Sequence, residues 1–285
     1  MSNKKNIKMF QFLQPYKVSD LIRLGSSNDG GYLVSEIDVK LTDNLISFGT
    51  SFDWQFEKDF KKFNKKVKID SYDGSVGTKY FTKNLKLRIK NLILKPSRKN
   101  LIRFITRLKL FFDFLIFYKF NLFKNTIHHH ESFVGSSLNE DFNNIFFENY
   151  GYYPNSISFE SFSKHIYNNT FLSIDIEGGE YDILNNIIAI QDKLIAIVIE
   201  FHDSNKNIEK IKEFISKLDL KIIHFHINNF GEIVDNIPSV FELTFSRSSN
   251  IIDSKVDFLP DILDEKNNIL ADDFTIVFEP KNLNQ

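Results

Sequence analysis

One stretch near the middle of the chain constrains the fold more than any other. Residues 171–184 read FLSIDIEGGEYDIL, an apolar run followed by a Gly178-Gly179 break and apolar residues at helical spacing. This order predicts a buried strand, a glycine turn and a helix, the repeating unit of an α/β sheet. Ligands bind such sheets beyond the carboxyl ends of the strands, where Asp175 and Glu177 point to one side. An acidic pair here is also typical of a helix cap, so the residues alone leave both interpretations open.

The composition limits the class of protein. The chain has 285 residues, 42% of them hydrophobic and 26% charged, which predicts one folded domain over residues 1–285. It contains no cysteine, which excludes disulfides and thiolate metal sites. Neither a signal peptide nor an apolar run long enough to cross a membrane is apparent, so we expect a cytoplasmic protein.

Positive charge is concentrated in one part of the chain. Thirteen lysine or arginine residues and one acid, Asp113, lie between Lys79 and Lys124. Residues 78–125 are predicted to form a basic, Phe-rich helical insertion within the domain, divided at Pro96. We favour an insertion that packs on the sheet, with long cationic side chains covering apolar surface.

A second interpretation of the insertion is contact with a membrane or with a charged acceptor. Residues 79–124 would then lie on anionic lipid at the inner face of the membrane. Nucleic acid is not expected as a partner, because the stretch is too apolar for a surface that follows phosphates. The sequence leaves the oligomeric state open.

Three motifs carry a resemblance to a known family. DIEGGEYDIL, at residues 175–184, resembles the D-x-E-G-x-E-x-x-x-L signature of FkbM-type methyltransferases, which use S-adenosylmethionine. The N-D-G-G-Y turn at 28–32 and the IEFHD strand end at 199–203 resemble segments of the same family. The resemblance covers most of residues 20–77 and 155–280 and does not account for the basic insertion.

The resemblance implies both a fold and an activity. The fold would be a Rossmann-like methyltransferase sheet, mostly parallel with an antiparallel last strand. The activity would be S-adenosylmethionine-dependent O-methyl transfer to a small-molecule or glycan acceptor. We expect a sugar hydroxyl of a surface polysaccharide, or of its nucleotide-linked precursor, as that acceptor.

A second strand–glycine–helix unit supplies candidate cofactor-binding residues. A predicted strand over 44–48 ends at Gly49, where a glycine lets the cofactor's methionine part approach the backbone. Asp53 or Glu57 is the candidate for its ammonium group, and a role of Asp53 as helix cap is the alternative. Asp73, 24 positions beyond Gly49, is the candidate for the ribose hydroxyls and is favoured over Asp70.

The remaining cofactor candidates come from the two turns that resemble the family. Asn28 and Asp29 are candidates for contact with the cofactor or the acceptor, and a plain hairpin turn is the alternative. Asp175 and Glu177 complete the predicted cofactor-binding set.

Polar pairs two residues apart predict the catalytic groups. They are Asp175 with Glu177, Glu200 with His202, and His224 with His226, each at the end of a predicted strand. If these strands are neighbours, the pairs meet in one cleft. A hydroxyl acceptor needs a base with a pKa near neutral, and histidine provides it. We predict His202 as the base, His226 as the second candidate, and Glu200 as a further catalytic residue.

Two other functions remain open. The same carboxylates and imidazoles can hold a divalent ion, as in a metal-dependent transferase or hydrolase, although the residues do not commit the site to metal. Alternatively, the chain is a non-catalytic protein of methyltransferase fold that docks a membrane-associated glycan assembly.

Overall fold

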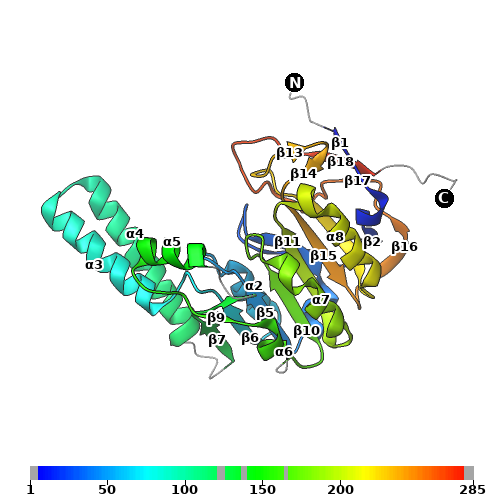
Figure 1. Cartoon of the computed structure of the whole chain (residues 1–285). Coiled ribbons are helices and arrows are strands. Elements are labelled where there is room, and N and C mark those ends of the chain that lie inside the picture. The colour runs from blue at the N-terminus through cyan, green and yellow to red at the C-terminus, as the bar shows by residue number, and fades with distance from the viewer. Residues whose placement is uncertain (1–5, 121–125, 136–139, 164–165, 279–285) are drawn as a thin grey trace.

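A seven-stranded sheet forms the centre of the molecule (Figure 1). The computed structural model describes residues 6–120, 126–135, 140–163 and 166–278. The strand order is β12-β15-β11-β10-β5-β6-β7. The strands are β5 (Asn44–Phe48), β6 (Lys68–Tyr72), β7 (Ile127–His130), β10 (Thr170–Ile174), β11 (Leu194–Phe201), β12 (Lys221–Ile227) and β15 (Phe241–Ser246). Strands β7, β6, β5, β10 and β11 are parallel, whereas β15 runs antiparallel to both its neighbours. This confirms the predicted Rossmann-like α/β fold.

The strand order creates a switch point beside β5. The chain proceeds from β5 outward to β6 and β7, and then returns to place β10 and β11 on the other side of β5. The carboxyl ends of β5 and β10 therefore lie together where the order reverses, the usual place for a ligand in an open α/β sheet.

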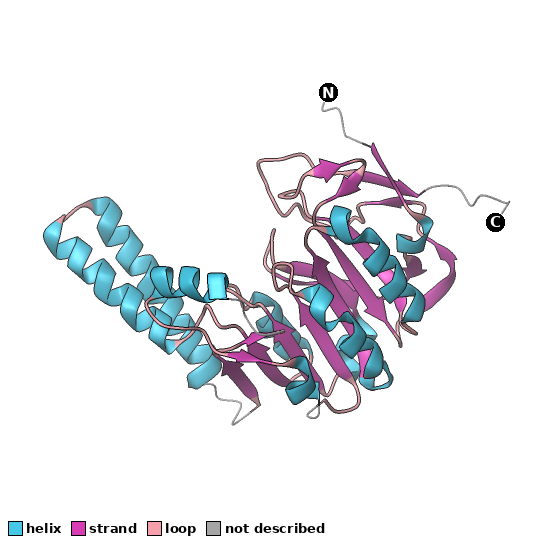
Figure 2. Cartoon of the chain, viewed as in Figure 1, coloured by secondary structure: helices cyan, strands magenta, loops and turns pink. Residues whose placement is uncertain are grey.

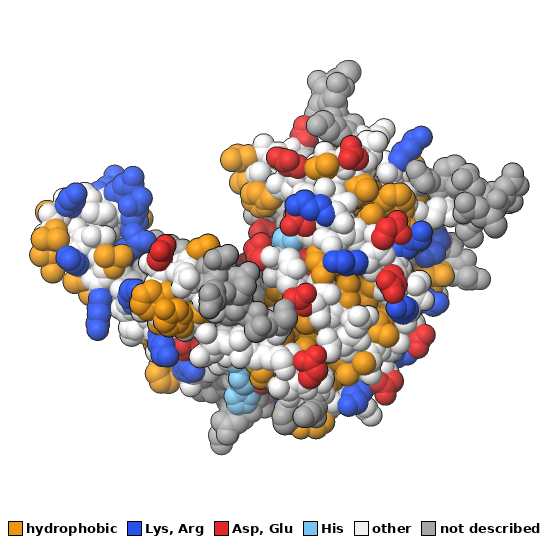
Figure 3. Space-filling view, in the orientation of Figure 1, with side chains coloured by type: hydrophobic (Ala, Val, Ile, Leu, Met, Phe, Trp, Pro, Cys, Tyr) orange, Lys and Arg blue, Asp and Glu red, His pale blue; other side chains and the backbone are white. Residues whose placement is uncertain are grey.

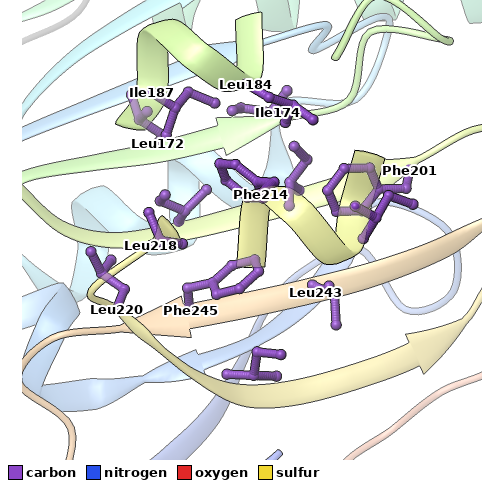
Figure 4. Packing of buried hydrophobic residues seen from close by; sticks show 14 of the residues in the cluster. Leu172, Ile174, Leu184, Ile187, Phe201, Phe214, Leu218, Leu220, Leu243 and Phe245 are labelled. Atoms are coloured by element: carbon purple, nitrogen blue, oxygen red, sulfur yellow. The ribbon is translucent and has the colours of Figure 1, made fainter. Parts of the chain in front are cut away.

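Helices cover both faces of the sheet (Figure 2). One face packs against α6 (Phe159–Ser163), α7 (Glu180–Ala189) and α8 (Ser204–Lys217), and Figure 4 shows part of this core. The other face packs against α1 (Glu36–Leu41), α2 (Gln55–Phe63) and the helices of the insertion. In β10, Phe171 faces the second core, whereas Leu172 and Ile174 face the first, as strand alternation requires.

The shorter strands form small two- and three-stranded sheets outside the main sheet. The β3–β4 hairpin carries the turn that contains Asn28 and Asp29. The shorter strands are β1 (Asn6–Met9), β2 (Tyr16–Val18), β3 (Leu21–Gly25), β4 (Gly31–Ser35), β8 (Phe133–Val134), β9 (Ser156–Ile157), β13 (Ile233–Val234), β14 (Ile237–Pro238), β16 (Ile251–Lys255), β17 (Phe258–Leu259) and β18 (Thr275–Phe278). A further helix, α5 (Glu140–Tyr150), lies between β8 and β9 in the chain.

The basic segment between β6 and β7 is a projecting helical hairpin. It consists of α3 (Thr78–Leu94) and α4 (Arg98–Phe114), with a π-helical turn over Leu115–Lys119. Only its root packs on the sheet, through the buried rings of Phe81 and Phe114, and its tip extends away from the body (Figure 1). Among the described residues, no helix is both long enough and apolar enough to span a bilayer.

Candidate functional site

The two strand ends at the switch point meet at a glycine. Gly49 ends β5 with φ +78°, and a Cβ atom built there would lie 1.5 Å from the backbone oxygen of Asp175. The amide of Asp175 in turn donates to the carbonyl of Phe48 at 3.0 Å. Only a residue without a side chain allows this approach, so Gly49 fixes how β5 and β10 end side by side.

A cavity of about 320 Å³ opens at this point. Four segments line it: the β3–β4 turn, the end of β5, the start of α2 and the end of β10. The lining residues are Asp29, Gly30, Tyr32, Ser47, Phe48, Gly49, Thr50, Ser51, Phe52, Asp53, Phe56, Glu57, Ser173 and Asp175. Four of these are acids, several are aromatic, and no lysine, arginine or histidine is among them. The lining therefore suits a ligand that carries positive charge and an aromatic ring.

Two of the lining carboxylates are desolvated. Burial raises the pKa of Glu57 to about 7. Burial also raises the pKa of Asp175 to about 7; the charge of His202 opposes the shift, and the charges of Glu177 and Asp29 add to it. Oε2 of Glu57 and Oδ1 of Asp175 are buried without a hydrogen-bond partner among the described residues. A cationic ligand would compensate both oxygens.

The buried carboxyl of Glu57 leads to a prediction on stability. Its pKa lies near 7 in the folded chain against 4.5 ordinarily. The folded protein keeps this proton while the unfolded chain releases it, so this residue's contribution to stability falls as the pH rises from 4.5 to 7. Glu57→Gln should therefore raise the free energy of unfolding by about 3 kcal/mol at pH 8 and by little at pH 4. Urea unfolding at the two pH values measures the difference, with exposed Glu209→Gln as the control.

His202 lies among four carboxylates. Its Nε2 is 3.5 Å from Glu177, 3.7 Å from Asp175 and 3.9 Å from Glu200, and its Nδ1 is 3.5 Å from Glu180. Burial opposes the imidazolium, but the hydrogen bond and charge of Glu180 and the charges of Asp175 and Glu177 outweigh it and raise the pKa of His202. The imidazole thus combines a proton-accepting nitrogen with anions that stabilise the proton it takes.

Glu180 holds this arrangement in place. The residue is fully buried at the start of α7, accepting from the amide of Gly178 at 2.8 Å and from that of His202 at 2.6 Å. The hydroxyl of Tyr181 donates to the carbonyl of His202 at 2.6 Å. The glycine turn after β10 is therefore tied to the end of β11, which fixes the position of His202.

An acid–amide network extends from the cavity toward β12. The amide of Asn228 donates to Glu200 at 2.7 Å and to Asp29 at 3.4 Å. The amide of Asn267 donates to Asp29 at 3.1 Å and to Glu242 at 2.9 Å. Asp29 is therefore the junction at which the β3–β4 turn closes over the strand ends.

The structure brings most of the predicted site residues together. Gly49, Asp53, Asp29 and Asp175 line the cavity. Glu177 and Glu200 lie beside His202 instead. Glu200 is buried, whereas the side chain of Glu177 is 86% exposed. Asp53 also accepts from the amide of Gln55 at 2.9 Å, so its role as a helix-start residue is present as well.

Asp73 and Asn28 lie outside both the cavity lining and the group around His202. Asp73 is buried and accepts from the amides of Ser51 and Ser75 at 2.6 and 2.7 Å, which makes it a brace between two loops. Asn28 is exposed, and its carbonyl accepts from Arg23 at 2.9 Å. The ribose and turn contacts assigned to them stay predictions.

His226 belongs to a neighbouring cluster. Its ring lies 3.7 Å from Glu242 and 3.6 Å from Asp273, and burial opposes its charge while both carboxylates raise its pKa well above the ordinary value. The strands of His202 and His226 are not adjacent, because β15 lies between them and contributes Glu242. The expectation that the three strands are neighbours is therefore wrong for β11 and β12.

Sequence reasoning missed part of the site. Glu242 and Asn267 were not expected at the cleft, and Glu57 was considered only as a partner for the cofactor's ammonium. An acid inside the apolar strand FELTFS was the available signal for Glu242.

One group of side chains has the geometry of a metal site. Asp175, Glu177 and His202 each offer one ligand atom, and these atoms lie within 4.8 Å of one another. A carboxylate–carboxylate–imidazole set suits several divalent ions.

Comparison with known proteins identifies one domain family. Residues 118–239 match the model of the methyltransferase FkbM domain, the family that the sequence motifs resemble. A search of curated proteins finds no match.

Two solved structures are similar to the chain at low identity. A methyltransferase FkbM from Methylobacillus flagellatus KT aligns at 12% identity and a TM-score of 0.36, over 71% of this chain and 44% of that one. A precorrin-6y C5,15-methyltransferase from Geobacter metallireducens GS-15 aligns at 10% identity and a TM-score of 0.34, over 74% and 86%. The chain spans less than half the length of the first structure. Residues 118–239 are therefore similar to the methyltransferase FkbM domain, and they lie within a Rossmann-like α/β sheet.

Proposed function

We propose that the protein is an S-adenosylmethionine-dependent O-methyltransferase. The observation that carries this proposal is a cavity at the switch point, lined by four acids and no cation, with an imidazole beside it. S-adenosylmethionine, when bound, supplies a methyl group on a positively charged sulfonium. Glu57, Asp53 and Asp175 are the residues that would hold its positive charges, and the aromatic lining residues would pack against its adenine.

His202 is the group we assign to the acceptor's proton. Glu180 lies at Nδ1 and would keep a proton on that nitrogen, which leaves Nε2 to accept one from a hydroxyl. Asp175, Glu177 and Glu200 then stabilise the imidazolium. Since methyl transfer from a sulfonium needs mainly alignment and a base, this arrangement is sufficient for the chemistry.

The proposed acceptor is a sugar hydroxyl of a surface polysaccharide or of its nucleotide-linked precursor. This choice rests on the resemblance to FkbM-type methyltransferases. A screen for transfer of labelled methyl groups from S-adenosylmethionine to nucleotide-sugars and purified glycans tests it. Labelled sugar ethers are the expected product, whereas labelling of amines alone would contradict O-methyl transfer.

Glu177→Gln should shift the pH dependence of this reaction. Glu177 is one of the carboxylates that raise the pKa of His202, so its neutral replacement lowers that pKa. Because the base must be unprotonated, the acid limb of the kcat profile should move to lower pH, with little change at high pH. Profiles of the wild type, Glu177→Gln and the control Glu209→Gln measure the shift. A profile that stays in place would remove Glu177 from the environment of the base.

A second candidate is a metal-dependent transferase, favoured by the ligand geometry of Asp175, Glu177 and His202. A divalent ion there would lower the pKa of the acceptor hydroxyl, and His202 would be a ligand rather than the base. Chelation followed by assay separates the two candidates. Our proposal predicts full activity after chelation, whereas loss of activity that added magnesium or manganese restores would favour the metal.

A further inference from the structure

The helical hairpin formed by α3 and α4 presents apolar side chains to solvent. Ile93 and Leu94, near the connection between the helices, are 73% and 66% exposed. Phe112 and Ile116, farther along the second helix, are 55% and 63% exposed. Exposed apolar groups of this size on one projecting element mark an interaction surface.

Cationic side chains share this hairpin with the apolar ones (Figure 3). On α3, lysines recur at intervals of four, three and four residues, which places them in one stripe along the outer face. The lysines of this stripe are Lys79, Lys83, Lys86 and Lys90. The amine of Lys79 lies 5.9 Å from the ring centroid of Tyr152 and Lys83 lies beside Gly151, whereas Lys86 and Lys90 are nearer the tip. Their side chains point away from the face that packs on α4, because the intervening residues at 81, 84, 85 and 88 are the less exposed ones.

The outer face of α4 is mainly apolar. Residues spaced four and three apart line this face, and each cation is followed by two apolar side chains. The series is Arg98, Ile102, Ile105, Lys109, Phe112 and Ile116. The one acid of the hairpin, Asp113, is neutralised by Lys58 at 2.5 Å and accepts from the indole of Trp54 at 2.8 Å. The apolar series of α4 points away from α3. On α3 itself, Leu87 and Ile89 flank the lysine stripe and are 52% and 45% exposed, so positive charge and apolar surface lie together on that helix.

We propose that the α3–α4 hairpin docks on the surface of an anionic lipid bilayer. The lysine stripe of α3 complements acidic headgroups, and the exposed leucine and isoleucine side chains that flank it suit the boundary between headgroups and acyl chains. A polyanion such as nucleic acid would match the charge but leave the apolar side chains in water. The hairpin lies on the membrane rather than crossing it, since no described helix qualifies as a span.

The root of the hairpin connects this surface to the cavity. The guanidinium of Arg107, on α4, lies 4.8 Å from the ring centroid of Phe52 and 5.6 Å from that of Tyr80. Phe52 lines the cavity. Docking would thus hold the cavity near the bilayer, where an acceptor attached to a lipid is within reach; this last step rests on the proposed function, whereas the docking itself does not.

Vesicle co-sedimentation of the full chain tests the docking. We expect binding to vesicles of equal parts phosphatidylglycerol and phosphatidylcholine, weakening as salt is raised, and little binding to phosphatidylcholine alone. Lys86→Gln with Lys90→Gln should weaken binding about thirtyfold. The matched control is Lys65→Gln with Lys66→Gln, two exposed lysines beyond the end of α2 that should leave binding unchanged.

A second variant tests the apolar part. Leu87→Ser with Ile89→Ser should weaken vesicle binding about tenfold or more while keeping the thermal unfolding midpoint, because both side chains are exposed. Equal binding to charged and neutral vesicles, or no effect of the lysine variant, would overturn the proposal. So would a stable dimer that the serine variant dissociates, since a second copy would then cover this face. Binding of S-adenosylmethionine, measured without vesicles, shows separately whether the proposed function holds.

Discussion

His202→Ala should lower methyl-transfer turnover about a hundredfold or more and leave the affinity for S-adenosylmethionine unchanged. The expected loss follows from the position of the imidazole, which is the proposed base and lies 3.7 Å from Asp175 in the cavity wall. Cofactor affinity is expected to persist, because the acids that line the cavity are intact in this variant. Single-turnover rates and calorimetry on the same preparation measure the two quantities.

The matched control is His128→Ala. His128 lies on β7 at the far edge of the sheet, four strands from β11, and its side chain is exposed. This control should retain wild-type turnover. Unchanged turnover in His202→Ala would exclude His202 as the base. A large loss of cofactor affinity in this variant would indicate that His202 binds the cofactor instead.

Gly49→Ala should prevent stable folding. A Cβ atom at this position would lie 1.5 Å from the carbonyl oxygen of Asp175, and φ +78° is strained for any side chain. Backbone cannot yield as a flexible side chain can, so β5 and β10 must separate at their ends. We expect a loss of about 4 kcal/mol or more in the free energy of unfolding, measured by urea denaturation.

Gly178→Ala separates backbone strain from this collision. Gly178 also has a positive φ, +100°, but a Cβ atom there would meet nothing within 4 Å. Its replacement should therefore cost only about 1 to 3 kcal/mol from strain. Equal losses in the two variants would show that the approach of β5 to β10 is not what requires glycine at residue 49.

Local patterns predicted the parts of the fold that depend on nearby residues. The strand, glycine turn and helix over 171–184 are present as β10, the turn and α7. The expected antiparallel last strand of the main sheet is also confirmed: β15 pairs antiparallel with β12, to which it is joined by a connection too short for a crossover helix. Both features depend on residue spacing and turn chemistry within a short stretch of the chain.

The order of distant strands could not be predicted in the same way. The last strand, β15, inserts between β11 and β12, so His226 is held away from His202. Nothing in the alternation of either strand specifies which neighbour it takes, because that choice depends on packing across the whole sheet. The same insertion brings in Glu242, and Asn267 reaches Asp29 from a loop 238 residues away.

The roles of individual acids were harder to predict than their presence. Asp73 follows its strand at the expected place, yet its two oxygens are taken by Ser51 and Ser75. Glu57 lies in an amphipathic helix, where an acid is ordinarily exposed, but here it is 2% exposed and lies beside Ser47 of β5. Burial by distant segments decides which carboxylates remain available to a ligand.

The central claim is that the acidic cavity at the ends of β5 and β10 binds a positively charged methyl donor. Titration calorimetry with S-adenosylmethionine, on the wild type and on Asp175→Asn, tests it most directly. We predict saturable one-to-one binding to the wild type and clearly weaker binding to the variant, since Asp175 is a half-buried carboxylate in the cavity wall. No heat at millimolar ligand, or equal affinity in both proteins, would contradict the claim.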